Sequence, residues 1–134
     1  MPTPLDSFRR LRRTGTFAPR FYDKLLNSDS RIRDMFARTD FEKQHRLFEH
    51  GVHVLLEYAG GSAIGGMAMS RLGERHSQRD LDVDPALYDI WVDCLIATAR
   101  ELDPRWTSIL ERRFKADLKK GIERMKLAYH AQAD

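Results

Sequence analysis

The feature that most constrains the fold is a long apolar stripe in the last third of the sequence. Its members recur every three or four residues, the spacing of one face of an α-helix: Trp106, Leu110, Phe114, Leu118, Ile122, Met125 and Tyr129. Such regular spacing is typical of a long helix with one continuous buried face. The stripe therefore predicts a helix over about 105–130.

The rest of the sequence shows further helical periodicity and no convincing strand alternation. Proline, glycine and short polar runs divide it into segments, and we expect helices over about 5–13, 19–26, 30–36, 40–58, 67–75 and 85–102. The expected start signals are Pro19, a capping box at 39–42, Asp84-Pro85 and Asp103-Pro104. We predict an all-α protein with at most seven helices, in one domain over 1–134.

Size and composition exclude several classes of protein. The chain has 134 residues, of which 42% are hydrophobic, enough for a single core or one large cofactor pocket. Cys94 is the only cysteine, which rules out an intrachain disulfide and a cysteine-based metal cluster within one chain. No apolar run approaches the roughly 18 residues of a membrane span. The N-terminus lacks a signal-peptide core, so we expect a cytoplasmic protein without a membrane partner.

The charge of the chain does not point to a particular class of binding partner. The formal net charge is +3, from 23 basic and 20 acidic residues that are well mixed. An N-terminal basic cluster could touch an anionic surface or form the solvated face of a helix: Arg9, Arg10, Arg12 and Arg13. No recognition-helix pattern, nucleophile motif or phosphate-binding glycine loop is present, so we expect no nucleic acid partner.

His76 is the residue with the clearest chemical meaning. It closes an apolar helical stretch at 63–75 and precedes a polar, helix-breaking stretch at 77–84. A neutral imidazole held at a helix end is how proteins present a single axial ligand to haem iron. The alternative is a surface histidine that follows a helix.

The expected 40–58 helix has two contrasting faces. One face is mostly apolar with an amide near its beginning, as in a ligand pocket with one placed hydrogen-bonding group: Gln44, Phe48, Gly51 and Leu55. The other face is polar throughout and comprises Arg46, His50, His53 and Glu57. His50 and His53 are therefore expected in solvent, although 49–55 superficially resembles the distal-histidine segment of animal myoglobins. His45, beside Gln44, either reaches the mouth of a pocket or lies on the helix surface.

Two aromatic residues earlier in the chain complete the candidates. Tyr22 puts a hydroxyl on an otherwise apolar helix face, where it needs a partner; a core tyrosine bonded to backbone is the simpler interpretation. Phe36 ends the third expected helix and either leans over a flat ligand or belongs to the core.

Together these segments resemble a bacterial single-domain globin of the myoglobin-like lineage that includes the globin domain of flavohaemoglobins. The resemblance rests on the order and spacing of several short segments: 21–26, 35–36, 39–41 with Gln44, 75–76, and Pro85 with 87–91. It implies a globin fold of about six to seven helices around a pocket for haem b, iron protoporphyrin IX.

The resemblance also implies roles for individual residues. His76 would be the proximal iron ligand, and Tyr22 with Gln44 would form the polar part of the distal pocket. Phe36 would stack on the haem edge and Phe48 would wall the site. The remaining implied pocket residues are Leu72, Tyr88 near the proximal side, and Arg75, which would either pair with a haem propionate or be solvated.

The implied function is reversible binding of oxygen or another diatomic gas (NO or CO) by a monomer or homodimer. Weak NO dioxygenase or peroxidase-like activity would need an external reductase. Two departures limit the resemblance. The stretch 76–85 is longer than in many relatives. Flavohaemoglobins also place a glutamate on the last helix to polarise the proximal histidine, whereas Glu123, the nearest candidate, lies beside the stripe at Ile122 rather than on it. The alternatives are a haem-free globin-fold module for signalling or protein interaction, and a basic helical protein that binds nucleic acid.

Overall fold

The computed structural model describes residues 3–61 and 85–133, with side chains placed as far as residue 124. Six α-helices and one 3₁₀ turn make up the regular structure of these residues: α1 (Pro4–Arg13), α2 (Phe17–Leu26), α3 (Ser30–Met35), α4 (Phe41–Ala59), η1 (Pro85–Leu87), α6 (Tyr88–Leu102) and α7 (Ser108–Ala133). The described ranges contain no strand. The predicted all-α class is confirmed, and no described helix is long and apolar enough to cross a membrane.

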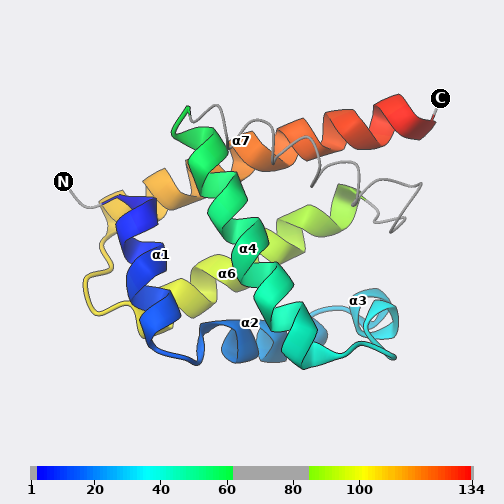
Figure 1. The fold of residues 1–134 in the computed structure, drawn as a ribbon, viewed down its shortest axis with the longest axis horizontal. Helices are drawn as coiled ribbons and strands as arrows, with labels where there is room; N and C mark the ends of the chain where they lie inside the picture. The colour runs from blue at the N-terminus through cyan, green and yellow to red at the C-terminus, as the bar shows by residue number, and fades with distance from the viewer. Residues whose placement is uncertain (1–2, 62–84, 134) are drawn as a thin grey trace.

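The helices cross one another around a shared core (Figure 1). The long helix α4 runs across α7 and also packs on α1 and α2, while α2 packs along α6. The core takes its largest fully buried side chains from most of these helices: Phe8, Leu11, Phe17, Phe21, Val52, Leu56, Leu95, Ile96, Leu110, Phe114 and Leu118. This arrangement brings α2 and the first half of α4 face to face, and the polar groups of the candidate site lie between them.

The predicted stripe of α7 is confirmed over the part that the structure describes. Leu110, Phe114 and Leu118 are fully buried, and Ile122 is only 4% exposed. Trp106 belongs to the turn before α7 rather than to the helix, and its ring packs on Phe114 at 5.8 Å. The side chains of Met125 and Tyr129 lie outside the described part.

The helix starts follow capping chemistry, with two corrections. The side chains of Thr3 and Asp29 accept hydrogen bonds from amides in the first turns of α1 and α3. The prediction that Pro19 occupies the first position of its helix is wrong, because α2 begins at Phe17. Proline is tolerated two residues later because the first four amides of a helix lack helical partners. Asp40, rather than Thr39, caps α4 and accepts from the amides of Glu42 and Lys43.

The predicted start of the last helix at Asp103-Pro104 is also wrong. Asp103 follows the last residue of α6, and α7 begins five residues later at Ser108, where the Thr107 hydroxyl accepts from the Leu110 amide. The Asp103 carboxylate is instead bound by the first helix: Arg10 donates to it at 2.8 and 2.9 Å, and Ser7 at 2.6 Å. The carboxylate still accepts a local bond from the Arg105 amide at 2.9 Å, but no α-helix begins there, and most of its hydrogen bonds come from α1.

Several expectations fall outside the described residues. The predicted 67–75 helix, the implied pocket residues Leu72 and Arg75, and the proposed iron ligand His76 are all in 62–84, as is Asp84. Gly60 ends α4 as predicted, and Gly61 follows it with a φ of +85°, a left-handed conformation that glycine adopts without steric cost.

Candidate functional site

A buried tyrosine–glutamine pair forms the polar centre of the candidate site. Tyr22, on α2, is 3% exposed, and its hydroxyl oxygen accepts a 2.8 Å hydrogen bond from Nε2 of Gln44 on α4. The two residues predicted as the polar part of a pocket are therefore in contact. The simpler interpretation of Tyr22, a hydroxyl bonded to backbone, is not what the structure has.

The polarity of this hydrogen bond determines what the pair can still do. A phenol both donates and accepts, whereas the amide nitrogen of glutamine only donates. Because Gln44 donates, the hydroxyl oxygen of Tyr22 acts as the acceptor and its own hydrogen is directed elsewhere. The arrangement can therefore present an O–H donor to an acceptor beside Tyr22, with Gln44 fixing the position of the oxygen.

Burial keeps the Tyr22 hydroxyl protonated. Desolvation raises the pKa of Tyr22 to about 12, and the hydrogen bond from Gln44 lowers it by a smaller amount. Tyr22 therefore stays a neutral donor at physiological pH. A neutral phenol among apolar rings interacts more strongly with a partial negative charge than it would in water.

Aromatic rings enclose Tyr22 on several sides. Four phenylalanines lie with ring centroids 5.0 to 5.6 Å from that of Tyr22 and meet it at steep angles of 70 to 82°: Phe21, Phe36, Phe41 and Phe48. His45 lies 5.5 Å away with its plane inclined by 31°. Edge-to-face packing of this kind favours particular ring orientations as well as burying apolar area.

One stripe of α4 supplies most of this enclosure. Phe41, Gln44, His45 and Phe48 follow the helical intervals of three, one and three residues, and each contacts Tyr22. Sequence reasoning found Gln44 and Phe48 but not the role of Phe41, and it left open whether His45 enters the site. The signal was available, because 41, 44, 45 and 48 form a regular i, i+3, i+4, i+7 face.

Phe48 is buried beside the tyrosine, in keeping with its place on the apolar face of α4. Its ring stacks on Phe21 with centroids 4.1 Å apart and an angle of 14°. Trp91 of α6 meets both rings, at 5.9 and 5.7 Å. The Tyr22–Gln44 pair is thus backed by a packed aromatic layer joining α2, α4 and α6.

Phe36 and Tyr88 occupy different surroundings. Phe36 is partly buried directly after α3, and its ring meets Tyr22 as well as Phe41, so it belongs to the same cluster. Tyr88 is buried at the first turn of α6. The implied proximal role of Tyr88 stays a prediction, since His76, the residue it would accompany, lies outside the described residues.

The polar face of α4 is confirmed as a solvent face. His50 and His53 are both exposed. His53 contacts Glu57 at 3.2 Å and stacks on Phe8 of α1, with ring centroids 6.0 Å apart. Their exposure agrees with the expectation, based on the two faces of the helix, that neither histidine takes the place of the distal histidine of animal myoglobins.

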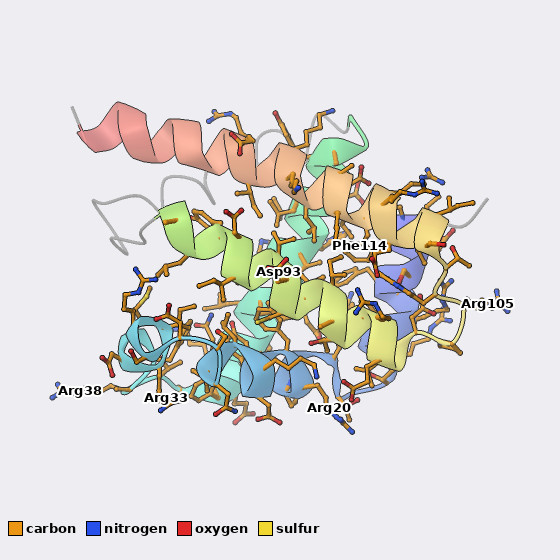
Figure 2. The ribbon with its side chains drawn as sticks, turned by 180° about the vertical axis from the view of Figure 1, so that it is seen from behind. Arg20, Arg33, Arg38, Asp93, Arg105 and Phe114 are labelled. Atoms are coloured by element: carbon orange, nitrogen blue, oxygen red, sulfur yellow. The ribbon has the colours of Figure 1, made fainter. Side chains whose placement is uncertain are left out.

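The described residues contain no side-chain cluster suited to a metal ion. No group of three or more His, Cys, Asp or Glu side chains within them could hold an ion. Glu123 is exposed on α7, in agreement with its expected place beside the buried stripe. Surface arginines such as Arg20, Arg33 and Arg38 point away from the body of the molecule (Figure 2).

Comparison with known proteins gives one strong structural match. A protein from Pseudomonas aeruginosa PAO1, described as structurally highly homologous to a human hemoglobin, superposes with a TM-score of 0.87. It is 31% identical, and the alignment covers 93% of this chain and 94% of that one. No protein-family model matches the chain, and no curated protein is significantly similar to it. The match supports a globin fold for this chain and does not place it in the flavohaemoglobin-type lineage.

Proposed function

The chain belongs to the same globin-like family as the Pseudomonas aeruginosa protein, and from this premise we propose that it is a haem-binding globin that reversibly binds a diatomic gas. The single observation that supports this most is the Tyr22–Gln44 pair, a hydrogen-bonded set of neutral donors buried among aromatic rings. A pocket of this chemistry suits a small, weakly basic ligand that accepts a hydrogen bond.

The residues in hand fit a haem, judged by the chemistry of the donors. Haem iron held by one histidine supplies an open coordination position where oxygen, NO or CO binds. Tyr22 would donate to the ligand, and Gln44 would hold the tyrosine oxygen in place. Phe48 would exclude water from the side of the haem on which the gas binds, and Phe36 would lie against the edge of the haem.

The other half of the proposed site rests on the sequence. His76 would hold the iron as the proximal ligand, and Leu72 would add to the apolar lining. Arg75 would pair with a propionate, since arginine recognises carboxylates through paired hydrogen bonds. Tyr88, buried at the start of α6, would lie near the proximal side.

An absorption series on the purified protein tests the proposal. We expect a red protein, or one that takes up added hemin in a 1:1 titration, with an intense Soret band that shifts on reduction and again with oxygen and with carbon monoxide. A colourless protein that binds no hemin would instead favour a haem-free globin-fold module for signalling or protein interaction.

A further inference from the structure

His45 is the one polar member of the Tyr22 cluster that the proposed function leaves unused. It follows Gln44 in α4, and its imidazole is half-buried. The ring centroid lies 5.5 Å from that of Tyr22 and 6.0 Å from that of Phe41. Half-burial suits histidine, whose ring packs on apolar surface while its nitrogen atoms reach water.

The angle of the His45 ring separates it from its neighbours. The four phenylalanines around Tyr22 meet the phenol ring at 70 to 82°. His45, at 31°, lies closer to parallel and packs on the tyrosine in a tilted arrangement. Together with the edge contacts, this tilted contact restricts rotation of the phenol about its side-chain bonds.

Gln44 alone does not fix where the Tyr22 hydroxyl points. One hydrogen bond holds the oxygen atom at a distance from Nε2 but permits the ring to tilt about that contact. A planar ring packed on the tyrosine limits this freedom, and the half-buried His45 supplies one from the position after Gln44.

We propose that His45 is a positioning residue that packs on the ring of Tyr22, keeps water from its hydroxyl and directs that hydroxyl toward the ligand. Only one part of this inference, the direction of the hydroxyl toward a ligand, rests on the proposed function. The shielding of Tyr22 is a property of the polypeptide and can be measured whether or not haem is bound.

The first test measures that shielding directly. Tyrosine is labelled with ¹³C at the ζ position, and the protein as purified, reduced and saturated with carbon monoxide if it is coloured, is titrated by NMR between pH 8 and 11. The Tyr22 resonance is identified by its loss in Tyr22→Phe. In the wild type, whose Tyr22 pKa is raised to about 12, it should barely move over this range.

Three variants give the comparison. His45→Ala should lower the Tyr22 pKa by about one unit, because water reaches the phenolate. His45→Phe restores a planar cover and should keep the wild-type titration. His50→Ala, an exposed histidine on the polar face of the same helix, is the matched control and should change nothing.

The second test is oxygen dissociation from the haem-loaded protein, followed by stopped-flow mixing with carbon monoxide. His45→Ala should release oxygen roughly three- to tenfold faster, as expected for a weakened but not abolished hydrogen bond. His45→Phe should stay within about twofold of the wild type, since its ring restores the packing. If His45→Ala does not fold, His45→Leu carries the same test, because it fills the volume without a planar ring.

The outcomes separate the two proposals. If the protein binds oxygen and Tyr22→Phe accelerates release while His45→Ala changes neither the off-rate nor the Tyr22 titration, the positioning role of His45 is overturned and the globin function stands. If no haem is bound but the Tyr22 titration still responds to His45→Ala and not to His50→Ala, the shielding role survives and the gas-binding proposal fails.

Discussion

The amide of Gln44 donates a 2.8 Å hydrogen bond to the hydroxyl of Tyr22, joining two helices across 22 positions of the sequence. The direction of that bond matters more than its length. It occupies an acceptor position on the phenol oxygen and leaves the O–H hydrogen for a third group. A tyrosine restrained in this way is a donor whose position is set before any ligand arrives.

Replacing Tyr22 with phenylalanine should accelerate oxygen release from the haem-loaded protein. Loss of a hydrogen bond in a dry pocket costs about 1–3 kcal/mol, equivalent to roughly a ten- to hundredfold faster off-rate. Stopped-flow kinetics measures this, with Tyr58→Phe as a control because Tyr58 packs near Lys120 rather than in the site. An unchanged off-rate in Tyr22→Phe would rule out Tyr22 as an oxygen donor.

Replacing His76 with alanine should abolish haem retention or the five-coordinate ferrous spectrum, because an iron without its proximal imidazole is held only by pocket contacts. His50→Ala should leave both unchanged, since His50 is exposed on the polar face of α4. Visible absorption spectra of the two purified variants suffice for the comparison. Loss of the haem spectrum in His50→Ala, with His76→Ala unaffected, would reverse the ligand assignment.

Replacing Asp103 with asparagine should lower the free energy of unfolding by about 3 kcal/mol, because Arg10 and Ser7 would lose a buried anionic partner. Asp93→Asn is the control, since Asp93 is exposed on the same helix (Figure 2). Urea unfolding followed by circular dichroism compares the two. Equal midpoints for the two variants would show that the network contributes no stability.

The same carboxylate makes stability depend on acid. Burial by itself would raise the pKa of Asp103, but the hydrogen bonds from Arg10, Ser7 and the Arg105 amide outweigh it, and the net pKa is lowered. The group's stabilisation is therefore present above the ordinary aspartate pKa of about 4 and is lost as the pH falls through the depressed folded-state value. Wild-type protein should lose stability over that range, and Asp103→Asn should lose less; parallel slopes would contradict this.

Replacing Gly121 with alanine should destabilise the crossing of α4 and α7. A Cβ atom at this position would collide with the side chain of Leu55, which is only 3% exposed and has little room to move. We expect a cost of about 1–2 kcal/mol from overpacking, partly relieved when Leu55→Ala is combined with it.

Gly51→Ala is the matched control for this crossing. Gly51 lies within α4, and a Cβ there meets nothing within 4 Å. The substitution should therefore stabilise the protein by about 0.5–1 kcal/mol through helix propensity alone. A stabilising effect of similar size at Gly121 would mean that the two helices are less tightly apposed than the structure has them.

Local periodicity predicted those parts of the fold and site that depend on one helix at a time. The spacing of Leu110, Phe114 and Leu118 is enough to place them in the core, because a helix exposes the same face every three or four residues. The same logic put Gln44 and Phe48 on one face and His50 on the opposite one, as the structure has them.

The predictions were wrong or incomplete where contacts with a distant segment of the chain determine the structure. Asp103-Pro104 has the form of a helix start, yet Arg10, 93 positions away, binds the carboxylate. The spacing of Phe41 and His45 puts them on the same face of α4 as Gln44, but which residue of α2 that face meets depends on how the two helices pack. The partner of Tyr22 was likewise a side chain from another helix rather than the neighbouring backbone.

The bond between Ser7 and Asp103 spans 96 positions, so during synthesis α1 leaves the ribosome long before the carboxylate that secures it. The buried face of nascent α1, with Phe8 and Leu11, can pack on α4 once that helix has been made, but Ser7 and Arg10 lack their buried partner until the end of α6 has been translated. The hydrogen bonds that tie the N-terminal helix to the end of α6 can therefore form only after residue 103 has left the ribosome.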